Sequence, residues 1–105
     1  MRDETICLHT GYEPEDGAPG VMPIVQSTTY RFKSTEHIGD LFNLPNECMY
    51  SRFANPTVDA VEKKIAALEG GVGAMCTCAG QAASLFSILN LCSAGDSFIS
   101  TSTIY

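Results

Sequence analysis

The apolar positions between residues 56 and 69 recur at the spacing of an α-helix. They step by three, four and three positions: Val58, Val61, Ile65 and Leu68. Asn55 is a typical N-cap, and Pro56 fits the first helical position, where its missing N–H has no consequence. Gly70-Gly71 is a typical helix end. The pattern predicts an amphipathic helix that packs through one face.

The following stretch, Gly70 to Gly95, contains no charged residue. It is long enough to be considered as a transmembrane helix, but its glycines and polar residues divide it better into two shorter elements. Val72–Cys78 is a nearly continuous apolar run, typical of a strand covered on both faces. Gln81–Cys92 is apolar on most sides and predicts a covered helix. After a turn, Ser97–Thr103 predicts a second strand.

The order helix, strand, helix, strand is typical of a doubly wound, mostly parallel α/β sheet with right-handed crossovers. Ligands of such sheets bind outside the carboxyl ends of the strands. We expect both the turn at Gly80 and the aromatic Tyr105 to lie at such ends. A helix that starts at Gly80 points free backbone N–H groups and the positive end of its dipole outward. The sequence therefore predicts an anion site, and we interpret the anion as a cofactor phosphate.

Residues 1–54 give few regular signals. Thr5–Leu8 and Ser34–Leu44 predict two short helices, Glu13–Gly20 predicts an acidic solvated loop, and Val21–Phe32 is extended in character. Such a long irregular segment is unusual in a compact domain. It is either a partly ordered tail or an arm that packs on another subunit, and the α/β domain begins at residue 55.

Arg52 is the single charged residue between Glu47 and Asp59. Tyr50 precedes it by two positions, so in an extended segment both side chains leave the same face. A guanidinium fork beside a phenol suits a phosphate, because Arg donates two parallel hydrogen bonds. The alternative is a surface Arg beside a packing Tyr, which the spacing alone favours.

Charge and cysteine content exclude several classes of protein. The net charge of −6 argues against non-specific binding of nucleic acid. The first residues are polar, so we expect no signal peptide and a cytoplasmic location. The odd count of five cysteines favours free thiols. Cys76 and Cys78 could form a thiol or metal module, but no His lies near them, so we expect buried thiols and no metal.

Eight motifs occur in a fixed order along the chain. They are His9-x-Gly11, Pro23-Ile24, Ser27-Thr28-Thr29, Tyr50-Ser51-Arg52 with Asn55-Pro56-Thr57, Leu68-Glu69-Gly70-Gly71, Ala79-Gly80-Gln81-Ala82-Ala83, Gly95-Asp96 and Tyr105. Together they resemble the Cys/Met-metabolism family of pyridoxal-phosphate enzymes. The resemblance covers nearly the whole chain. It implies fold type I, the aspartate aminotransferase-like fold, and pyridoxal 5′-phosphate (PLP) as the cofactor.

The resemblance also implies roles for individual residues. Tyr50 and Arg52 resemble the pair that reaches from one subunit to the cofactor phosphate of its neighbour. Gly80 and Gln81 resemble the backbone N–H donors to the phosphate in the subunit's own site. Tyr105 resembles the aromatic ring stacked on the pyridine ring, so Tyr105 and Tyr50 count as candidate catalytic residues. The resemblance further implies a homotetramer, a dimer of dimers with sites shared between subunits, and we expect no nucleic-acid or membrane partner.

The residues after Gly80 point to one branch of the family. Gln81 followed by two alanines resembles the O-acetylhomoserine sulfhydrylases, whereas lyases and synthases usually carry S-G-M-x-A. The implied reaction is γ-replacement, in which acetate leaves O-acetylhomoserine and a sulfur nucleophile adds, giving homocysteine or methionine. A methionine or cystathionine γ-lyase and a cystathionine γ-synthase are the alternatives. Cys78 departs from the family, which usually has Ser ahead of the turn.

The family is several times longer than this chain. No lysine here matches its Schiff-base lysine: Lys33, Lys63 and Lys64 lie in other contexts. The acid that pairs with the pyridine nitrogen is absent too. We therefore expect the N-terminal part of an enzyme, inactive by itself. A non-catalytic fragment that binds a partner chain through its uncharged run is the alternative of another class.

Overall fold

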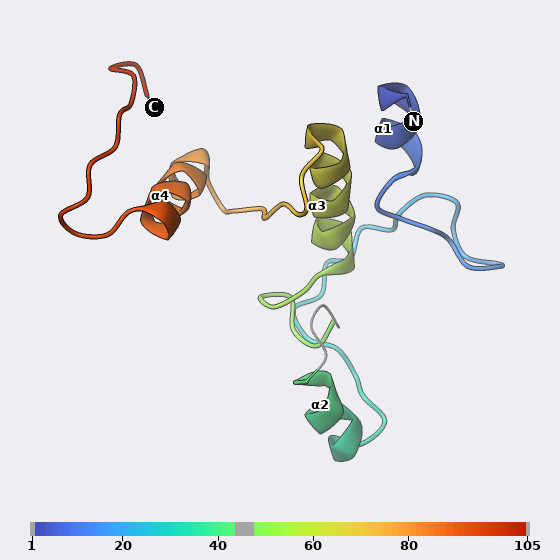
Figure 1. Cartoon of the computed structure of the whole chain (residues 1–105). Helices are drawn as coiled ribbons and strands as arrows, with labels where there is room; N and C mark the ends of the chain where they lie inside the picture. The colour runs from blue at the N-terminus through green and yellow to red at the C-terminus, as the bar shows by residue number, and fades with distance from the viewer. Residues whose placement is uncertain (1, 44–47, 105) are drawn as a thin grey trace. The chain divides into compact units, whose positions relative to one another are not determined.

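The computed structural model describes residues 2–43 and 48–104. Figure 1 shows the four helices of this part of the chain. They are α1 (Asp3–His9), α2 (Thr35–Leu41), α3 (Pro56–Glu69) and α4 (Gly80–Leu91). The chain divides into two compact units, Met1–Ala74 with the first three helices and Met75–Tyr105 with α4. Each unit is described by itself.

Helix α3 confirms the helix predicted from the apolar spacing, at both of its ends. The Asn55 side chain accepts hydrogen bonds from the backbone N–H groups of Thr57 (3.0 Å) and Val58 (3.4 Å). At the other end Gly70 takes the left-handed conformation, with φ of 65°, and the Gly71 N–H donates to the Ala66 carbonyl at 2.8 Å. This is the glycine-terminated helix end that the sequence predicted.

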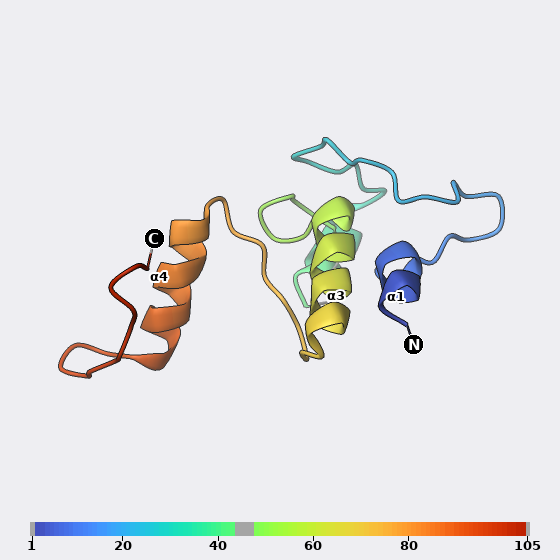
Figure 2. The same cartoon turned by 90° about the horizontal axis from the view of Figure 1, so that it is seen from above.

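Helix α1 lies beside α3, as the two views of Figures 1 and 2 agree. The contact continues just after α1, where Gly11 approaches the buried Ala60 of α3. Gly11 has φ of 96°, and a Cβ at this position would overlap the Ala60 carbonyl oxygen. Only glycine satisfies both conditions. The packing of the predicted apolar face is partial, since Val61 and Ile65 remain 47% and 46% exposed.

Helix α2 begins where the sequence predicted. The Ser34 hydroxyl accepts from the His37 N–H at 3.2 Å. The backbone N–H of Glu36 and the Ser34 hydroxyl also lower the pKa of the Glu36 carboxyl. The helix ends at Leu41, which is buried, whereas we predicted Leu44. Leu44 itself lies outside the described residues.

Both predicted strands are wrong for this chain. Neither Val72–Cys78 nor Ser97–Thr103 is a strand, and within the described ranges β-structure is limited to one antiparallel bridge, Thr29 with Tyr50. The two apolar runs are exposed, with Val72 at 113% and Ile99 at 102%. A strand is stabilised by hydrogen bonds to a neighbouring strand, and neither run has such a neighbour among these residues.

Helix α4 is confirmed to within one residue at each end, but its predicted burial is wrong. None of its residues is buried, and Leu85, Phe86 and Leu89 are 52%, 49% and 62% exposed. The expectation of buried thiols fails for the same reason, since Cys76 and Cys78 are exposed. Helix bounds follow from local sequence, whereas burial depends on elements that pack from elsewhere.

Replacing Gly11 should destabilise the first unit far more than replacing Gly17. Both glycines have positive φ (96° and 79°), but a Cβ at Gly17 meets nothing within 4 Å. We expect Gly17→Ala to cost about 1 kcal/mol, the penalty of a left-handed alanine. Gly11→Ala should cost roughly 2–3 kcal/mol more through overpacking against α3. Urea unfolding measures both, and equal losses would show that the contact with Ala60 is unimportant.

Candidate anion-binding site

The first turn of α4 is free of internal partners. Its N-cap, Ala79, has extended backbone and offers no side-chain cap, and the first helical hydrogen bond runs from Ala83 N–H to the Ala79 carbonyl at 3.1 Å. The N–H groups of Gly80, Gln81 and Ala82 therefore have no acceptor in the described part of the chain. The first turn contains no acidic side chain. Three free donors at the positive end of a helix dipole are suited to bind an anion.

Gly80 has no reason within the chain to be glycine. It does not belong to the glycines with positive φ, and a Cβ built on it meets no atom within 4 Å. An open backbone at a helix start is what a ligand needs to approach the N–H groups closely. Gly20, Gly39 and Gly73 are equally open, so what suits Gly80 to a bound phosphate is its position at a helix start beside free N–H groups.

The second group of predicted residues lies in the other unit, on a turn before α3. The Phe53 and Ala54 N–H groups both donate to the Tyr50 carbonyl, at 2.8 and 3.2 Å. The segment is thus a turn and not extended as we had assumed, yet Tyr50 and Arg52 still meet. The Arg52 guanidinium carbon lies 5.5 Å from the centre of the Tyr50 ring and 5.1 Å from that of Phe53. We call Tyr50, Arg52 and Phe53 the Arg52 cluster.

Arg52 is exposed, and none of the described residues gives it a carboxylate partner. Its contacts are aromatic faces, which leave the N–H groups of the guanidinium available for an oxyanion. Tyr50 is 36% exposed and its ring contacts Phe53, so the geometry agrees both with a phosphate contact and with the alternative, a surface Arg beside a packing Tyr. As far as the described residues are concerned, the cluster can bind an anion without breaking an ion pair.

Ser51, which lies between Tyr50 and Arg52, and Asn55, which follows them, hold the turn in place. The Ser51 hydroxyl donates to the Ser27 carbonyl, and the Ser51 N–H donates to the Thr28 carbonyl at 2.9 Å. The Asn55 amide donates to the Val25 carbonyl (3.1 Å) and to the Ser51 hydroxyl oxygen (3.0 Å). We call Ser51, Asn55 and Thr57 the arm clamp, because they join the segment 23–29 to α3.

Thr57 completes the arm clamp. Its hydroxyl donates to the Pro23 carbonyl at 3.0 Å and accepts from the Val25 N–H at 2.9 Å. Sequence reasoning recognised Asn55 only as a cap and missed the clamp. The available signal was the set of hydrogen-bonding side chains beside a segment of extended character, whose backbone groups need partners.

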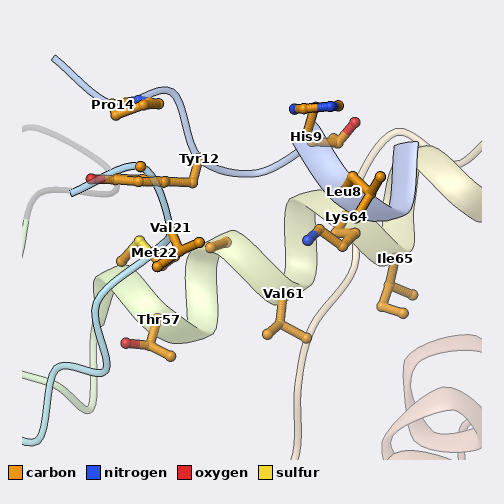
Figure 3. A pocket seen from close by; sticks show the side chains of 13 residues that line it. Leu8, His9, Tyr12, Pro14, Val21, Met22, Thr57, Val61, Lys64 and Ile65 are labelled. Atoms are coloured by element: carbon orange, nitrogen blue, oxygen red, sulfur yellow. The ribbon is translucent and has the colours of Figure 1, made fainter. Parts of the chain in front are cut away.

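The predicted site residues belong to two units of the structure, each described by itself. Tyr50 and Arg52 come together in the first unit, Gly80 and Gln81 adjoin in the second, and Tyr105 lies outside the described residues. A cavity of about 390 Å³ in the first unit contains none of them. Figure 3 shows its lining, which includes Lys64 of α3 together with Tyr12 and Val21 from the segment that follows α1.

The described ranges contain neither a candidate metal site nor a candidate membrane-spanning helix. No three His, Cys, Asp or Glu side chains come close enough to hold a metal ion. None of the helices in this part combines the length and apolar character that crossing a bilayer requires.

Comparison with known proteins identifies the class. Residues 4–105 match the sequence model of the family described as Cys/Met metabolism PLP-dependent enzyme. The chain belongs to this family, whose cofactor is pyridoxal phosphate. The free N–H groups at Gly80 and the open guanidinium of Arg52 are both suited to the phosphate group of that cofactor.

Individual relatives of the chain carry more specific names than the family does. The O-acetyl-L-homoserine sulfhydrylase 1 of Thermus thermophilus is 48% identical over 107 residues, covering 100% of this chain and 25% of the relative. The homocysteine/cysteine synthase of Saccharomyces cerevisiae is 42% identical, covering 97% and 24%. A solved Campylobacter jejuni structure, named as an O-acetylhomoserine (thiol)-lyase with N′-pyridoxyl-lysine-5′-monophosphate, is 34% identical, with a TM-score of 0.78 over 91% of this chain and 24% of its own. The chain spans about a quarter of the length of the curated relatives it matches.

Asn55→Asp should separate the cap of α3 from the arm clamp. The new carboxylate still accepts from Thr57 and Val58 but no longer donates to Val25 and Ser51. Asn55 is 8% exposed, so the unpaired oxygens should cost about 2–3 kcal/mol of unfolding free energy at neutral pH. A protonated carboxyl regains a donor, so part of the loss should return in acid.

Urea unfolding at two pH values measures this effect. Asn43→Asp, the same change at an exposed position, is the control; it loses only the long hydrogen bond to the Gly39 carbonyl (3.4 Å) at the end of α2 and should cost less than about 1 kcal/mol. A loss at Asn55 as small as that at Asn43 would contradict the arm clamp.

Proposed function

We propose that this chain is the N-terminal part of a PLP-dependent transferase that makes homocysteine or methionine. The enzyme replaces the acetate of O-acetylhomoserine by a sulfur nucleophile, sulfide or a thiol. The observation that carries the proposal is the start of α4, where three free N–H donors follow Ala79 in a chain 48% identical to an O-acetyl-L-homoserine sulfhydrylase. The same proposal includes a cytoplasmic location.

The N–H groups of Gly80 and Gln81 bind the cofactor phosphate in the subunit's own site. They add no charge, so the dianion is stabilised by hydrogen bonds and by the helix dipole. The absence of an acidic side chain from the first turn supports this role, because a carboxylate there would repel the phosphate. The bound cofactor supplies the electron sink of its pyridine ring.

Arg52 and Tyr50 bind the phosphate of a neighbouring subunit. Arg52 contributes the positive charge that the start of α4 lacks. Tyr50 contributes its hydroxyl group, and its ring already contacts the Arg52 guanidinium. Tyr105 stacks on the pyridine ring, and substrate specificity depends on the rest of the enzyme. Shared sites require a homo-oligomer, and we propose a dimer of dimers.

A product assay of the full-length protein tests the reaction. With O-acetylhomoserine and sulfide we expect equal amounts of homocysteine and acetate, and with methionine alone no 2-oxobutyrate. Activity should disappear when the cofactor is removed by dialysis against hydroxylamine, which takes the aldehyde from the lysine, and return when the reagent is removed and PLP is added. Efficient release of 2-oxobutyrate from methionine without replacement would instead favour a γ-lyase of the same family.

Replacing Gly80 by proline tests the phosphate donors. Proline at the first helical position preserves the helix, and the extended backbone of Ala79 (φ −158°, ψ 152°) accommodates a following proline. Gly80→Pro removes one N–H, and we expect phosphate affinity to fall by about tenfold or more. Gly80→Ala keeps the N–H but adds a Cβ, as proline also does, so the affinity of the proline variant is compared with that of the alanine variant and not with that of the unchanged protein.

The measurement is calorimetric titration of the cofactor-free full-length protein with 4′-deoxypyridoxine 5′-phosphate. This analogue lacks the aldehyde and therefore reports non-covalent binding alone. Equal affinities of the proline and alanine variants would refute the assignment of the Gly80 N–H.

A further inference from the structure

The Arg52 cluster contains a residue to which the proposed function gives no task. The Phe53 ring lies 5.1 Å from the Arg52 guanidinium carbon, closer than the Tyr50 ring at 5.5 Å. The two rings meet edge to face, with centres 6.4 Å apart. The guanidinium thus lies over both rings of one aromatic pair.

The backbone of Phe53 is also held in place. Its N–H donates to the Tyr50 carbonyl at 2.8 Å, and the next residue, Ala54, is buried. The Phe53 ring itself is 65% exposed, so it contributes little to a core. Among the exposed apolar side chains that the structure describes, Phe53 and Tyr50 are the ones whose rings lie beside the Arg52 guanidinium.

We propose that Phe53 is a positioning residue that holds the Arg52 guanidinium ready for the cofactor phosphate. This inference rests on the proposed function, since it assigns a support to the same phosphate contact. An arginine side chain has many rotamers, and ordering it on binding costs affinity. Contact with two ring faces removes part of that freedom in advance.

An aromatic support suits this purpose better than a carboxylate. A carboxylate would occupy the N–H donors and neutralise the charge, so the phosphate would have to compete with it. A phenyl ring attracts the cation through its face and offers no hydrogen-bond acceptor atom. The guanidinium remains both oriented and fully charged.

The test uses the cofactor-free full-length protein and two probes. One probe is 4′-deoxypyridoxine 5′-phosphate, and the other is 4′-deoxypyridoxine, which lacks the phosphate. Phe53→Leu keeps an apolar side chain but removes the ring, and Phe53→Tyr restores it. Phe42→Leu is the matched control, since Phe42 is 69% exposed, caps the end of α2 and is not one of the described rings that contact Arg52.

We expect Phe53→Leu to lower the affinity for the phosphorylated probe about two- to fivefold, the range for an exposed cation–π contact. Phe53→Tyr and Phe42→Leu should bind it as the unchanged protein does. The probe without phosphate should bind all these variants equally. In an Arg52→Ala background, which should itself lose about tenfold or more, Phe53→Leu should have no further effect.

The outcomes separate this inference from the proposed function. If Arg52→Ala weakens the phosphorylated probe and Phe53→Leu does not, the role of Phe53 is wrong and that of Arg52 stands. If Arg52→Ala has no effect, the proposed phosphate contact fails and the inference fails with it. If Phe53→Leu weakens both probes equally, or still acts without Arg52, Phe53 has a structural role only and the inference is overturned.

Discussion

The Asn55 side chain makes the interaction on which the arrangement of the first unit depends. Its oxygen caps α3, while its nitrogen binds the Val25 carbonyl and the Ser51 hydroxyl. A side-chain amide is suited to this double task, because it carries an acceptor and two donors in one rigid plane. One buried residue thus fixes where α3 begins and where the segment before it lies.

The motif around Asn55 divides into an inner and an outer set of side chains. Ser51, Asn55 and Thr57 face backbone groups of segment 23–29 and build the arm clamp. Tyr50, Arg52 and Phe53 lie on the outside of the same turn. The two sets therefore have different roles in one short motif. The inner set fixes the backbone of the turn, and this backbone determines where the side chains of the outer set lie.

Helix positions could be predicted from the sequence because their signals are local. Asn55-Pro56 and Gly70 specify both ends of α3, and Ser34 specifies the start of α2. The failed strands at 72–78 and 97–103 share another cause. Their apolar composition shows only that they are suited to a covered sheet, whereas pairing requires a second strand that neither finds among the described residues.

The site could be predicted in part, and glycine shows why. Gly11 and Gly80 each belong to a motif of the family, and the motifs alone do not say why either position is glycine. In the structure Gly11 is required by the contact with Ala60, while Gly80 has open space around it. A glycine explained by packing carries no information about a ligand. A glycine that neither φ nor packing explains, at the start of a helix with free N–H groups, points to a group that binds there.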